Sequence, residues 1–425
     1  MRFLLRTVVI WALLGGLVWY LEREQQVGRF QQVDEVFEDF LIANTRARFD
    51  LNAVQPSEDV VYVGWSPADA AEFSSWPPPP LDWQMLIQQL AAWHPEVLVV
   101  TTPLNWGQPH PDFVPAVKEA LLPFQSVVLA VEGELAEGAA LEGGTFLGGL
   151  EERLPVFARQ SGSDGAAAEL RALVQPPDEL LLPCGELGVT VGPETAQLYG
   201  AAVVRSDGQR VWMPLLLGQV LSRLEKAPYA NQRVRLGRGA GVHVGPERFV
   251  PLTEDGRVEI AEPTSAPGVR RINGLDLMVG DLAPTLALED RAALEKARLI
   301  VVGLMGADAP GPALAETLAR IDALPRLQRL PLTAQWAVWC VAGLVGWWMV
   351  MRVRRGRALL VALGGIFAAL TISYLVFESQ GLWCPPTMPC AILLGAAFLT
   401  LLFGRSSQET RSEAEPTPSS PATSD

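Results

Sequence analysis

The stretch DVVYVGWSPADAAEFSSWPPPPLDW, residues 59 to 83, determines how the largest part of this chain folds. Its apolar run VVYVG (60–64) has the length and the β-branched residues of a buried strand. After the four prolines at 77–80, apolar residues recur at the spacing of one helix face: Trp83, Leu86, Ile87 and Leu90. A buried strand followed by an amphipathic helix begins a β-α-β unit, so the stretch predicts an α/β domain.

Similar units follow along the chain. Three further apolar runs predict buried strands: VLVV (97–100), SVVLAV (126–131) and LIVVG (299–303). Helices are predicted at 113–122, 217–224 and 289–297. Because strands that alternate with helices pair in parallel through right-handed crossovers, we expect a mostly parallel central sheet. Two segments that turn on Asp-Gly, 201–214 and 249–260, predict β-hairpins.

The proline run lies between Trp76 and Trp83. Proline restricts the backbone without donating hydrogen bonds, and Asp82 is a residue type that caps helices. We therefore interpret the run as a rigid strand-to-helix crossover in which Asp82 caps the following helix. The alternative is an exposed docking ligand, because polyproline segments commonly bind partner proteins.

Four apolar segments predict transmembrane α-helices, at 7–21, 334–351, 359–377 and 387–403. A cleaved signal peptide is the alternative for the first, but it ends directly at charged Glu22 without a small-x-small cleavage site. Short cytoplasmic loops are enriched in Lys and Arg. The basic residues near the spans are Arg2, Arg6, Arg352, Arg354, Arg355 and Arg357. Their positions predict a multi-pass protein of the inner (cytoplasmic) membrane with both termini in the cytoplasm.

These spans divide the chain into parts. We expect an N-terminal anchor at 1–23, an extracytoplasmic domain at 24–330, three transmembrane helices within 331–404 and a disordered cytoplasmic tail at 405–425. The extracytoplasmic, or periplasmic, domain is expected to consist of a helical stalk at 24–50 and an α/β body at 55–310. Apolar residues at helical intervals are expected to pack the stalk: Val33, Val36, Phe37, Phe40 and Leu41.

The charge and the motifs exclude several functions. The extracytoplasmic domain carries a net charge of about −17, more negative than the −14 of the whole chain, which makes nucleic acid and anionic lipid surfaces unsuitable partners. The four cysteines and three histidines show no zinc-ligand spacing. The sequence contains no Gly-x-Ser-x-Gly, Walker or His-Glu-x-x-His motif. We therefore expect no catalytic residue, metal or cofactor, and no enzymatic activity.

The order of these segments resembles the CHASE sensor domain of the second type, an extracytoplasmic ligand-sensing module of bacterial receptors. The stretches that carry the resemblance are 59–83, EVLVVTTPLNW (96–106), RSDGQRVWMPLLLGQVLSRL (205–224), VPLTEDGRVEI (250–260) and ARLIVVGLMGADAP (297–310). The family's layout of one leading span and three trailing spans is also similar. The resemblance covers nearly the whole chain and implies a sensor of signal transduction, although each motif is short.

The chain departs from the family's pattern at three places. Gly64 and Trp65 stand where the family has an acidic residue, Pro80 stands where it has Arg, and Thr101 stands where it has Asp. The resemblance therefore implies a degenerate, stand-alone form. Family receptors often continue into a kinase or cyclase, whereas only a polar segment follows residue 403 here. The expected output partner is a separately encoded kinase, cyclase or other envelope protein.

Ligands of open α/β sheets usually bind at the carboxyl ends of the strands. The candidate ligand-binding residues at these ends are Trp65, Ser66, Asp69, Trp76, Thr101, Asn105, Trp106, His110, Asp112 and Asp308. Aromatic side chains with a few polar groups suit a small molecule or a peptide. The alternative is that the tryptophans only cover the core.

Two functions follow from these patterns. The first is a membrane-anchored sensory or ligand-binding module, a monomer or a homodimer, that relays or recruits through its trailing helices. Its partners would be the lipid bilayer, a small-molecule or peptide ligand and the output protein. The second is a structural scaffold or assembly protein of the cell envelope that has no ligand.

Overall fold

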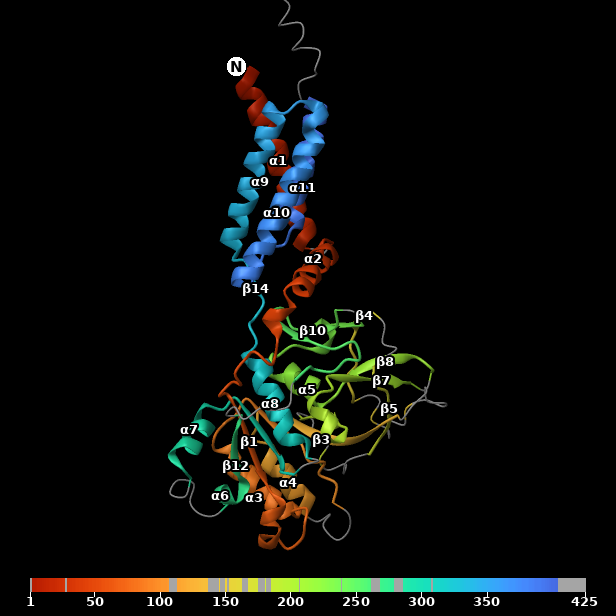
Figure 1. The fold of residues 1–425 in the computed structure, drawn as a ribbon, viewed down its shortest axis with the longest axis vertical. Helices are drawn as coiled ribbons and strands as arrows, with labels where there is room; N and C mark the ends of the chain where they lie inside the picture. The colour runs from red at the N-terminus through yellow and green to blue at the C-terminus, as the bar shows by residue number, and fades with distance from the viewer. Residues whose placement is uncertain are drawn as a thin grey trace, which may run out of the picture. The chain divides into compact units, whose positions relative to one another are not determined.

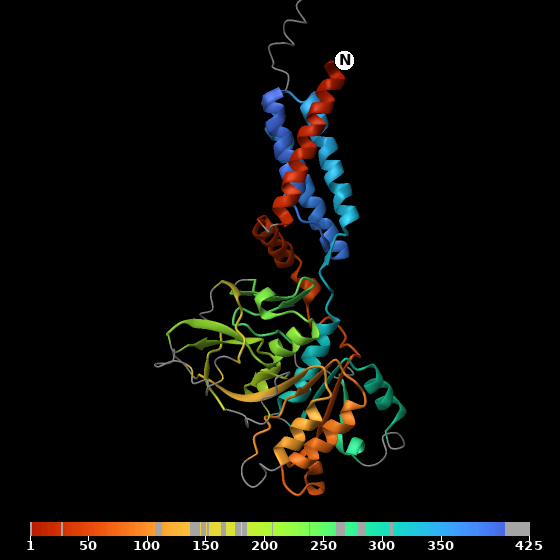
Figure 2. The ribbon, with the colours of Figure 1, turned by 180° about the vertical axis from the view of Figure 1, so that it is seen from behind.

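The computed structural model describes residues 2–26, 29–106, 113–136, 145, 150, 153–162, 167–174, 180, 185–205, 207–237, 239–260, 268–278, 286–306 and 309–403. The chain divides into two compact units, shown in Figures 1 and 2. The helical unit combines Met1–Thr45 with Leu327–Asp425, and the α/β unit is Arg46–Arg326. Residues 24–45, which we expected in the stalk, therefore belong to the helical unit. The expected tail at 405–425 lies outside the described residues.

The α/β unit is built on a mostly parallel sheet, as predicted. Its parallel strands are β1 (Val60–Trp65), β2 (Val97–Val100), β3 (Val127–Leu135), β6 (Gly185–Thr190), β12 (Arg270–Asn273) and β13 (Leu299–Leu304). Their order across the sheet is β12-β1-β13-β2-β3-β6. A seventh strand, β5 (Leu170–Leu173), pairs antiparallel with the end of β3. β1 and β2 follow each other in the sequence but are not neighbours in the sheet. β13, which comes much later in the sequence, lies between them.

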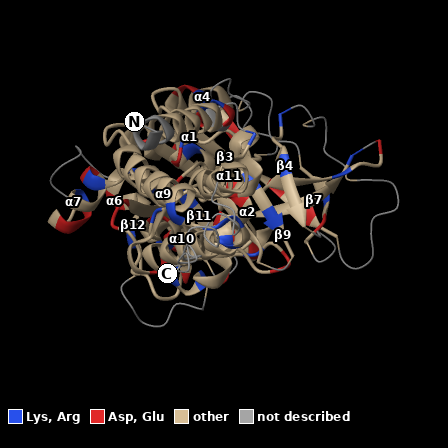
Figure 3. Ribbon diagram, turned by 90° about the horizontal axis from the view of Figure 1, so that it is seen from above, with Lys and Arg blue, Asp and Glu red and all other residues tan. Residues whose placement is uncertain are grey.

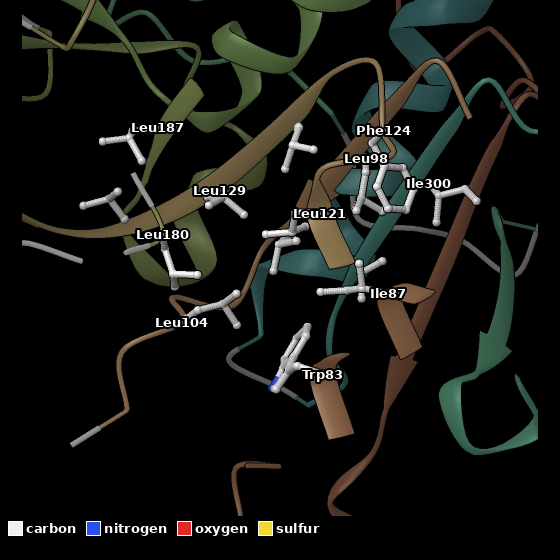
Figure 4. Close-up of a cluster of buried hydrophobic side chains, with 14 of the residues drawn as sticks. Trp83, Ile87, Leu98, Leu104, Leu121, Phe124, Leu129, Leu180, Leu187 and Ile300 are labelled. Atoms are coloured by element: carbon white, nitrogen blue, oxygen red, sulfur yellow. The ribbon is translucent and has the colours of Figure 1, made fainter. Parts of the chain in front are cut away.

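Helices cover both faces of this sheet. On one face, α3 (Pro80–Ala91) and α4 (Val114–Leu121) bury Trp83, Ile87 and Leu121 against strand residues such as Leu98 and Ile300 (Figure 4). On the other face lie α5 (Leu216–Leu224) and α8 (Pro310–Ala323). Side chains alternate between faces along a strand, so Val61 and Val63 point to α3 while Tyr62 contacts Gly311 of α8. The sheet is therefore doubly wound.

Shorter helices and a smaller sheet complete the α/β unit. The helices are α6 (Gly274–Met278) and α7 (Leu288–Lys296). The second sheet has the order β11-β10-β9-β4, with β4 (Arg159–Gly162), β9 (Arg233–Leu236), β10 (Gly241–Val244) and β11 (Arg248–Pro251). In Figure 3, basic residues mark β4 and β9. The unit thus consists of one large sheet, its helices, this four-stranded sheet and a two-stranded hairpin of β7 (Gly200–Val204) and β8 (Arg210–Pro214).

One hairpin prediction is confirmed and the other is wrong in part. β7 and β8 pair antiparallel around Gly208, whose φ of 80° is easily adopted only by glycine. In 249–260, the first strand instead pairs with β10, and Arg257 bridges to Leu198. The Asp-Gly turn forms, but the residues on its two sides pair with other segments of the domain and not with each other as a hairpin.

The proline run is a buried crossover. Pro78, Pro79 and Pro80 are buried, and the Trp106 indole N–H donates to the Pro78 carbonyl at 3.3 Å. Pro79 occupies the N-cap position of α3 and Asp82 lies within its first turn, so the predicted cap is wrong. Burial raises the pKa of the Asp82 carboxyl.

The helical unit contains α1 (Arg2–Gln26), α2 (Gln31–Asn44), α9 (Leu332–Arg352), α10 (Ala358–Gln380) and α11 (Thr387–Phe403). All four segments predicted to span a membrane are helical. Among the described residues, however, two helices rather than four are long and apolar enough to cross a bilayer, Leu332–Arg352 and Arg355–Gln380. With 17 residues, α11 is about 25 Å long, somewhat less than a hydrocarbon core of about 30 Å. The second half of α1 carries the charged residues Glu22, Arg23 and Glu24.

The expected packing face of α2 is wrong. Leu41 is buried as expected, but Val33, Val36 and Phe40 are exposed. The buried face instead carries Asp34 and Glu38. Asp34 Oδ1 accepts hydrogen bonds from the Thr387 hydroxyl at 2.6 Å and from the Thr387 N–H at 3.3 Å, at the start of α11. The hydrogen bonds between Asp34 and the start of α11 therefore determine which face of α2 is buried, and its apolar stripe is left exposed.

Candidate functional site

The predicted ligand-binding residues that the structure describes come from two segments that meet at the carboxyl edge of the main sheet. The segment after β1 holds Trp65, Ser66, Asp69 and Trp76, and the segment after β2 holds Thr101, Asn105 and Trp106. Only β13 separates these strands, so the structure brings both segments to one edge. His110, Asp112 and Asp308 lie outside the described residues.

Asp69 is held by hydrogen bonds from its neighbours. Its Oδ2 accepts from the Ser66 N–H at 2.7 Å and from the Ser66 hydroxyl at 3.0 Å. Its Oδ1 accepts from the Asn273 side-chain amide at 3.3 Å, at the end of β12. The network ties the segment after β1 to the edge strand, so both carboxylate oxygens already have protein partners.

Thr101 fills the space between β2 and β13. Its side chain is 1% exposed, and its hydroxyl donates to the Val302 carbonyl at 3.0 Å. A Cβ atom at Gly311 would lie 2.7 Å from the Thr101 hydroxyl oxygen, and one at Gly303 would clash with it. Nearby, the Tyr62 hydroxyl donates to the Leu304 carbonyl at 2.9 Å, and burial raises the pKa of this phenol. Close packing of α8 against the strands therefore closes this crevice.

The tryptophans of the carboxyl edge belong largely to the core. Trp65 is fully buried, with its ring edge-on to Phe73 at 5.4 Å and to Trp83 at 4.9 Å between centroids. Trp76 is partly buried and packs on the same cluster. Asn105 is exposed. This edge can hold its own loops in place, and any ligand there would meet the rim around Asn105 and Trp76 rather than Trp65.

A cavity of about 430 Å³ lies at the opposite, amino edge of the sheet. It is lined by residues that precede or begin β2, β3 and β6 and by the turn after α5: Glu96, Val97, Gln125, Ser126, Glu186, Ser222, Arg223, Lys226, Ala227, Pro228 and Tyr229. Lys226 has a φ of 49°, which bends the chain away from α5 over the strand starts. The volume is in the range of small-molecule sites.

Ion pairs and hydrogen bonds position the cavity's side chains. The Arg223 guanidinium pairs with Glu186, whose second oxygen lies 3.3 Å from the Tyr229 hydroxyl. Burial, and next the Glu186 charge, raise the pKa of Tyr229, which therefore stays a neutral donor. A hydrogen bond from Arg298 at 3.1 Å holds the pKa of Glu96 below its usual range. Each carboxylate is thus positioned by an arginine, Glu186 by Arg223 and Glu96 by Arg298.

Several buried polar atoms near the cavity lack protein partners within the described part of the chain. They are Ser126 Oγ, Arg223 Nε and Gln219 Nε2. Gln219 lies behind the lining, where its side-chain oxygen contacts the Tyr229 hydroxyl. Buried polar groups are normally paired with protein, water or ligand. The cavity therefore offers unused hydrogen-bonding groups.

Sequence reasoning missed this cavity because it looked only after the strands. The available signal was polar residues directly before apolar runs, Glu96 before 97–100 and Gln125 before 126–131. The partners from β6 and α5, Glu186 and Arg223, are brought there only by the fold.

The described residues contain no group of three His, Cys, Asp or Glu side chains arranged to hold a metal ion. His243 Nε2 lies 2.8 Å from the Arg233 guanidinium, where the imidazole accepts a hydrogen bond. This contact gives His243 a structural partner on the neighbouring strand.

Comparison with known proteins finds no match to this chain among family models, curated proteins or solved structures.

Proposed function

We propose that this protein is a membrane-anchored sensory module, in which an extracytoplasmic α/β domain binds a small molecule or peptide and acts through trailing transmembrane helices on separately encoded partners. The observation that carries the proposal is a helical unit that is apolar both inside and outside. Buried side chains from four helices pack together, including Leu14 of α1, Met349 of α9, Ala362 of α10 and Ala396 of α11.

The outward faces of these helices are apolar as well. More than half of each of the following side chains is exposed: Trp19, Val341, Leu360, Phe367 and Phe398. A helix that is hydrophobic on all sides is buried in protein or lies in a membrane. Lipid is the partner that suits these faces, which supports a transmembrane role for α1 and α11 as well as for α9 and α10.

The distribution of charge supports one orientation in the bilayer. The Arg355 guanidinium donates to the Leu402 carbonyl at 3.1 Å, so the basic loop between α9 and α10 lies beside the end of α11. The start of α1 lies at the same end of the helical unit (Figures 1 and 2). By the positive-inside rule, this end is cytoplasmic.

The other end of the helical unit has the character of a membrane interface. There, β14 (Gln328–Arg329) pairs with β15 (Leu382–Trp383), and the Arg329 guanidinium lies 5.1 Å from the centre of the Trp383 ring. Trp and Arg are typical of the headgroup region. Because the chain passes from this end into the α/β unit, that unit is proposed to be extracytoplasmic.

The resemblance to the CHASE sensor family supports a sensory role. A scaffold without a ligand is the second candidate, and one observation favours it: the polar groups of Asp69 and Thr101 at the carboxyl edge are paired within the protein. The two candidates differ in whether the α/β unit binds a ligand.

Cysteine labelling in cells tests the membrane topology. After the native cysteines are replaced by serine, single cysteines are introduced at Arg171, an exposed position of the α/β unit, or at Arg354 in the basic loop. A membrane-impermeant maleimide is expected to label Arg171→Cys in intact cells and Arg354→Cys only after permeabilisation. Labelling in the opposite order would overturn the proposed orientation.

Co-purification tests the relay. The full chain, solubilised in mild detergent, is expected to retain a kinase or cyclase that a chain lacking 331–425 does not retain. The shortened chain keeps α1 and the whole α/β unit as a matched control. Equal recovery with both chains, or recovery of neither enzyme, would contradict action through the trailing helices.

A further inference from the structure

The cavity at the amino edge presents charges of both signs on facing elements. The carboxylates of Glu96 and Glu186 come from the strand side, and the cations Arg223 and Lys226 come from the end of α5 and its turn. Arg298 has the largest effect in lowering the pKa of Glu96, and the charge of Lys226 acts in the same direction. The lining residues carry two negative and two positive groups, so their formal charges cancel.

This arrangement excludes most simple ions as preferred ligands. A small anion that approaches Arg223 and Lys226 also meets two carboxylates, and a small cation meets the two basic groups. An apolar molecule would remove four charged groups from water without replacing their hydrogen bonds. A molecule that carries both charges at short separation satisfies both sides at once.

The unpartnered atoms specify where hydrogen bonds are available. Ser126 Oγ and Arg223 Nε both belong to lining residues, and neither has a protein partner within the described residues. Arg223 uses its terminal nitrogen for Glu186, which leaves the buried Nε–H to donate elsewhere. A guanidinium N–H and a hydroxyl are both groups that donate hydrogen bonds to carboxylate oxygens.

We propose that this cavity binds a small zwitterion of the class of free α-amino acids. The ligand's carboxylate is received by Arg223, Lys226 and the Ser126 hydroxyl, and its ammonium group by Glu186 and Glu96. The volume of about 430 Å³ leaves room for a side chain and water beyond the charged groups. Tyr229, a neutral donor beside Glu186, closes one wall.

The amino-acid site rests on the proposed function in one respect, since a sensor needs a ligand. The binding test below and the co-purification test above can fail independently of each other. If the protein binds an amino acid but recruits no kinase or cyclase, the proposed site stands and the proposed relay is wrong. If the protein has the expected membrane topology and partner but binds no amino acid, the proposed relay stands and the proposed site is wrong.

The test uses the full chain purified in detergent. Each of the twenty common L-amino acids is added in turn, and binding is followed by thermal unfolding and by titration calorimetry. For each binder, the N-acetyl derivative and the methyl ester are measured as probes that lack one charge. We expect at least one free amino acid to bind, and each blocked form to bind about tenfold or more weakly. Failure of all twenty to bind, or equal binding of both blocked forms, would overturn the proposal.

Variants locate the site. Lys226→Asn keeps a residue that tolerates positive φ, and Ser126→Ala removes only a hydroxyl that has no protein partner in the described part of the chain, so both variants are expected to fold normally. Each is expected to weaken the binder by about tenfold, the loss of a charge-assisted contact. Glu186→Gln should weaken the ammonium side similarly. The matched control is Glu134→Gln, an exposed carboxylate of the same sheet that pairs with Arg171. Unchanged affinity in Lys226→Asn and Ser126→Ala would place the ligand elsewhere.

Discussion

The two edges of the main parallel sheet use their polar groups differently. At the carboxyl edge, Thr101 and Asp69 form hydrogen bonds within the protein, and the buried Trp65 indole nitrogen is the atom there that has no partner among the described residues. At the amino edge, Ser126 and Arg223 keep buried polar atoms beside a cavity. Open α/β sheets usually bind ligands at the carboxyl edge, where connections diverge to opposite faces. The comparison teaches that strand order shows where a crevice can form, whereas packing decides whether it stays open.

The two edges differ because of the helix that packs at each of them, α8 at the carboxyl edge and α5 at the amino edge. The first turn of α8 brings Gly311 against Thr101 and Tyr62, so the crevice beside β13 is filled. At the other edge, α5 ends at Leu224 and the chain turns at Lys226, which leaves space over the starts of β2 and β3.

The largest effect is expected from Trp65→Ala at the carboxyl edge. Trp65 is fully buried between Phe73 and Trp83, so its truncation should lower the free energy of unfolding by about 3–5 kcal/mol. Urea titration of the detergent-solubilised chain measures the loss. Asn105→Ala, an exposed change at the same edge, is the control and should alter stability by less than about 0.5 kcal/mol. A stable Trp65→Ala protein would favour a ligand-binding role for this residue instead.

A smaller loss is expected from filling the space at Gly303. A Cβ atom there would clash with the Thr101 hydroxyl, and overpacking of this kind costs about 1–3 kcal/mol. Thr101→Ala in the same chain should restore part of the loss by removing that oxygen. Gly306→Ala is the matched control, because among the described residues its Cβ atom would meet only the Ala309 Cβ atom, at 4.0 Å. Thermal unfolding compares the variants, and equal stability of the two single variants would show that this crevice is open.

Removing one hydroxyl from each edge compares them directly. Thr101→Val loses the hydrogen bond to Val302 and should destabilise the protein by about 1 kcal/mol. Ser126→Ala removes a hydroxyl that has no partner among the described residues, and it should leave the free energy of unfolding of the unliganded protein unchanged within about 0.5 kcal/mol. Both are measured by urea titration without added ligand. Equal losses would mean that Ser126 has a structural partner, such as an ordered water.

The smallest effects concern pH, and they have opposite signs at the two edges. The pKa of Glu96 is lowered by Arg298, so its contribution to stability is present above the ordinary Glu pKa and is lost as pH falls through the lowered value. The pKa of Asp82 is raised by burial, so its contribution is present below the ordinary Asp pKa and is lost as pH rises through the raised value.

Two isosteric variants measure these contributions. At neutral pH, Glu96→Gln should be less stable than the original protein and Asp82→Asn at least as stable, and both differences should shrink on acidification. Each should stay below about 1 kcal/mol because both carboxyls are substantially solvated. Urea titrations in neutral and acidic buffers compare them. If both variants were less stable than the original protein at neutral pH, or both more stable, the opposite pKa shifts of Glu96 and Asp82 would be contradicted.

Much of the fold could be predicted because its signals are local. Apolar runs of strand length predicted β1, β2 and β13, and helical spacing predicted α3 and α5. The candidate residues near Thr101 and Asp69 were placed correctly at one edge, because parallel strands end on the same side. Which of them remain available to a ligand was not predictable, since that depends on α8, which follows much later in the chain.

By itself, the sequence determined the alternation of strands and helices, the hairpin at Gly208 and the apolar helices at both ends of the chain. These features depend on residue types a few positions apart. Only the tertiary structure decided that β13 lies between β1 and β2, that α2 buries Asp34, and that Glu186 and Arg223 meet Glu96 and Lys226 around a cavity. Strands buried on both faces look alike in sequence, so their order is set by how the whole domain packs.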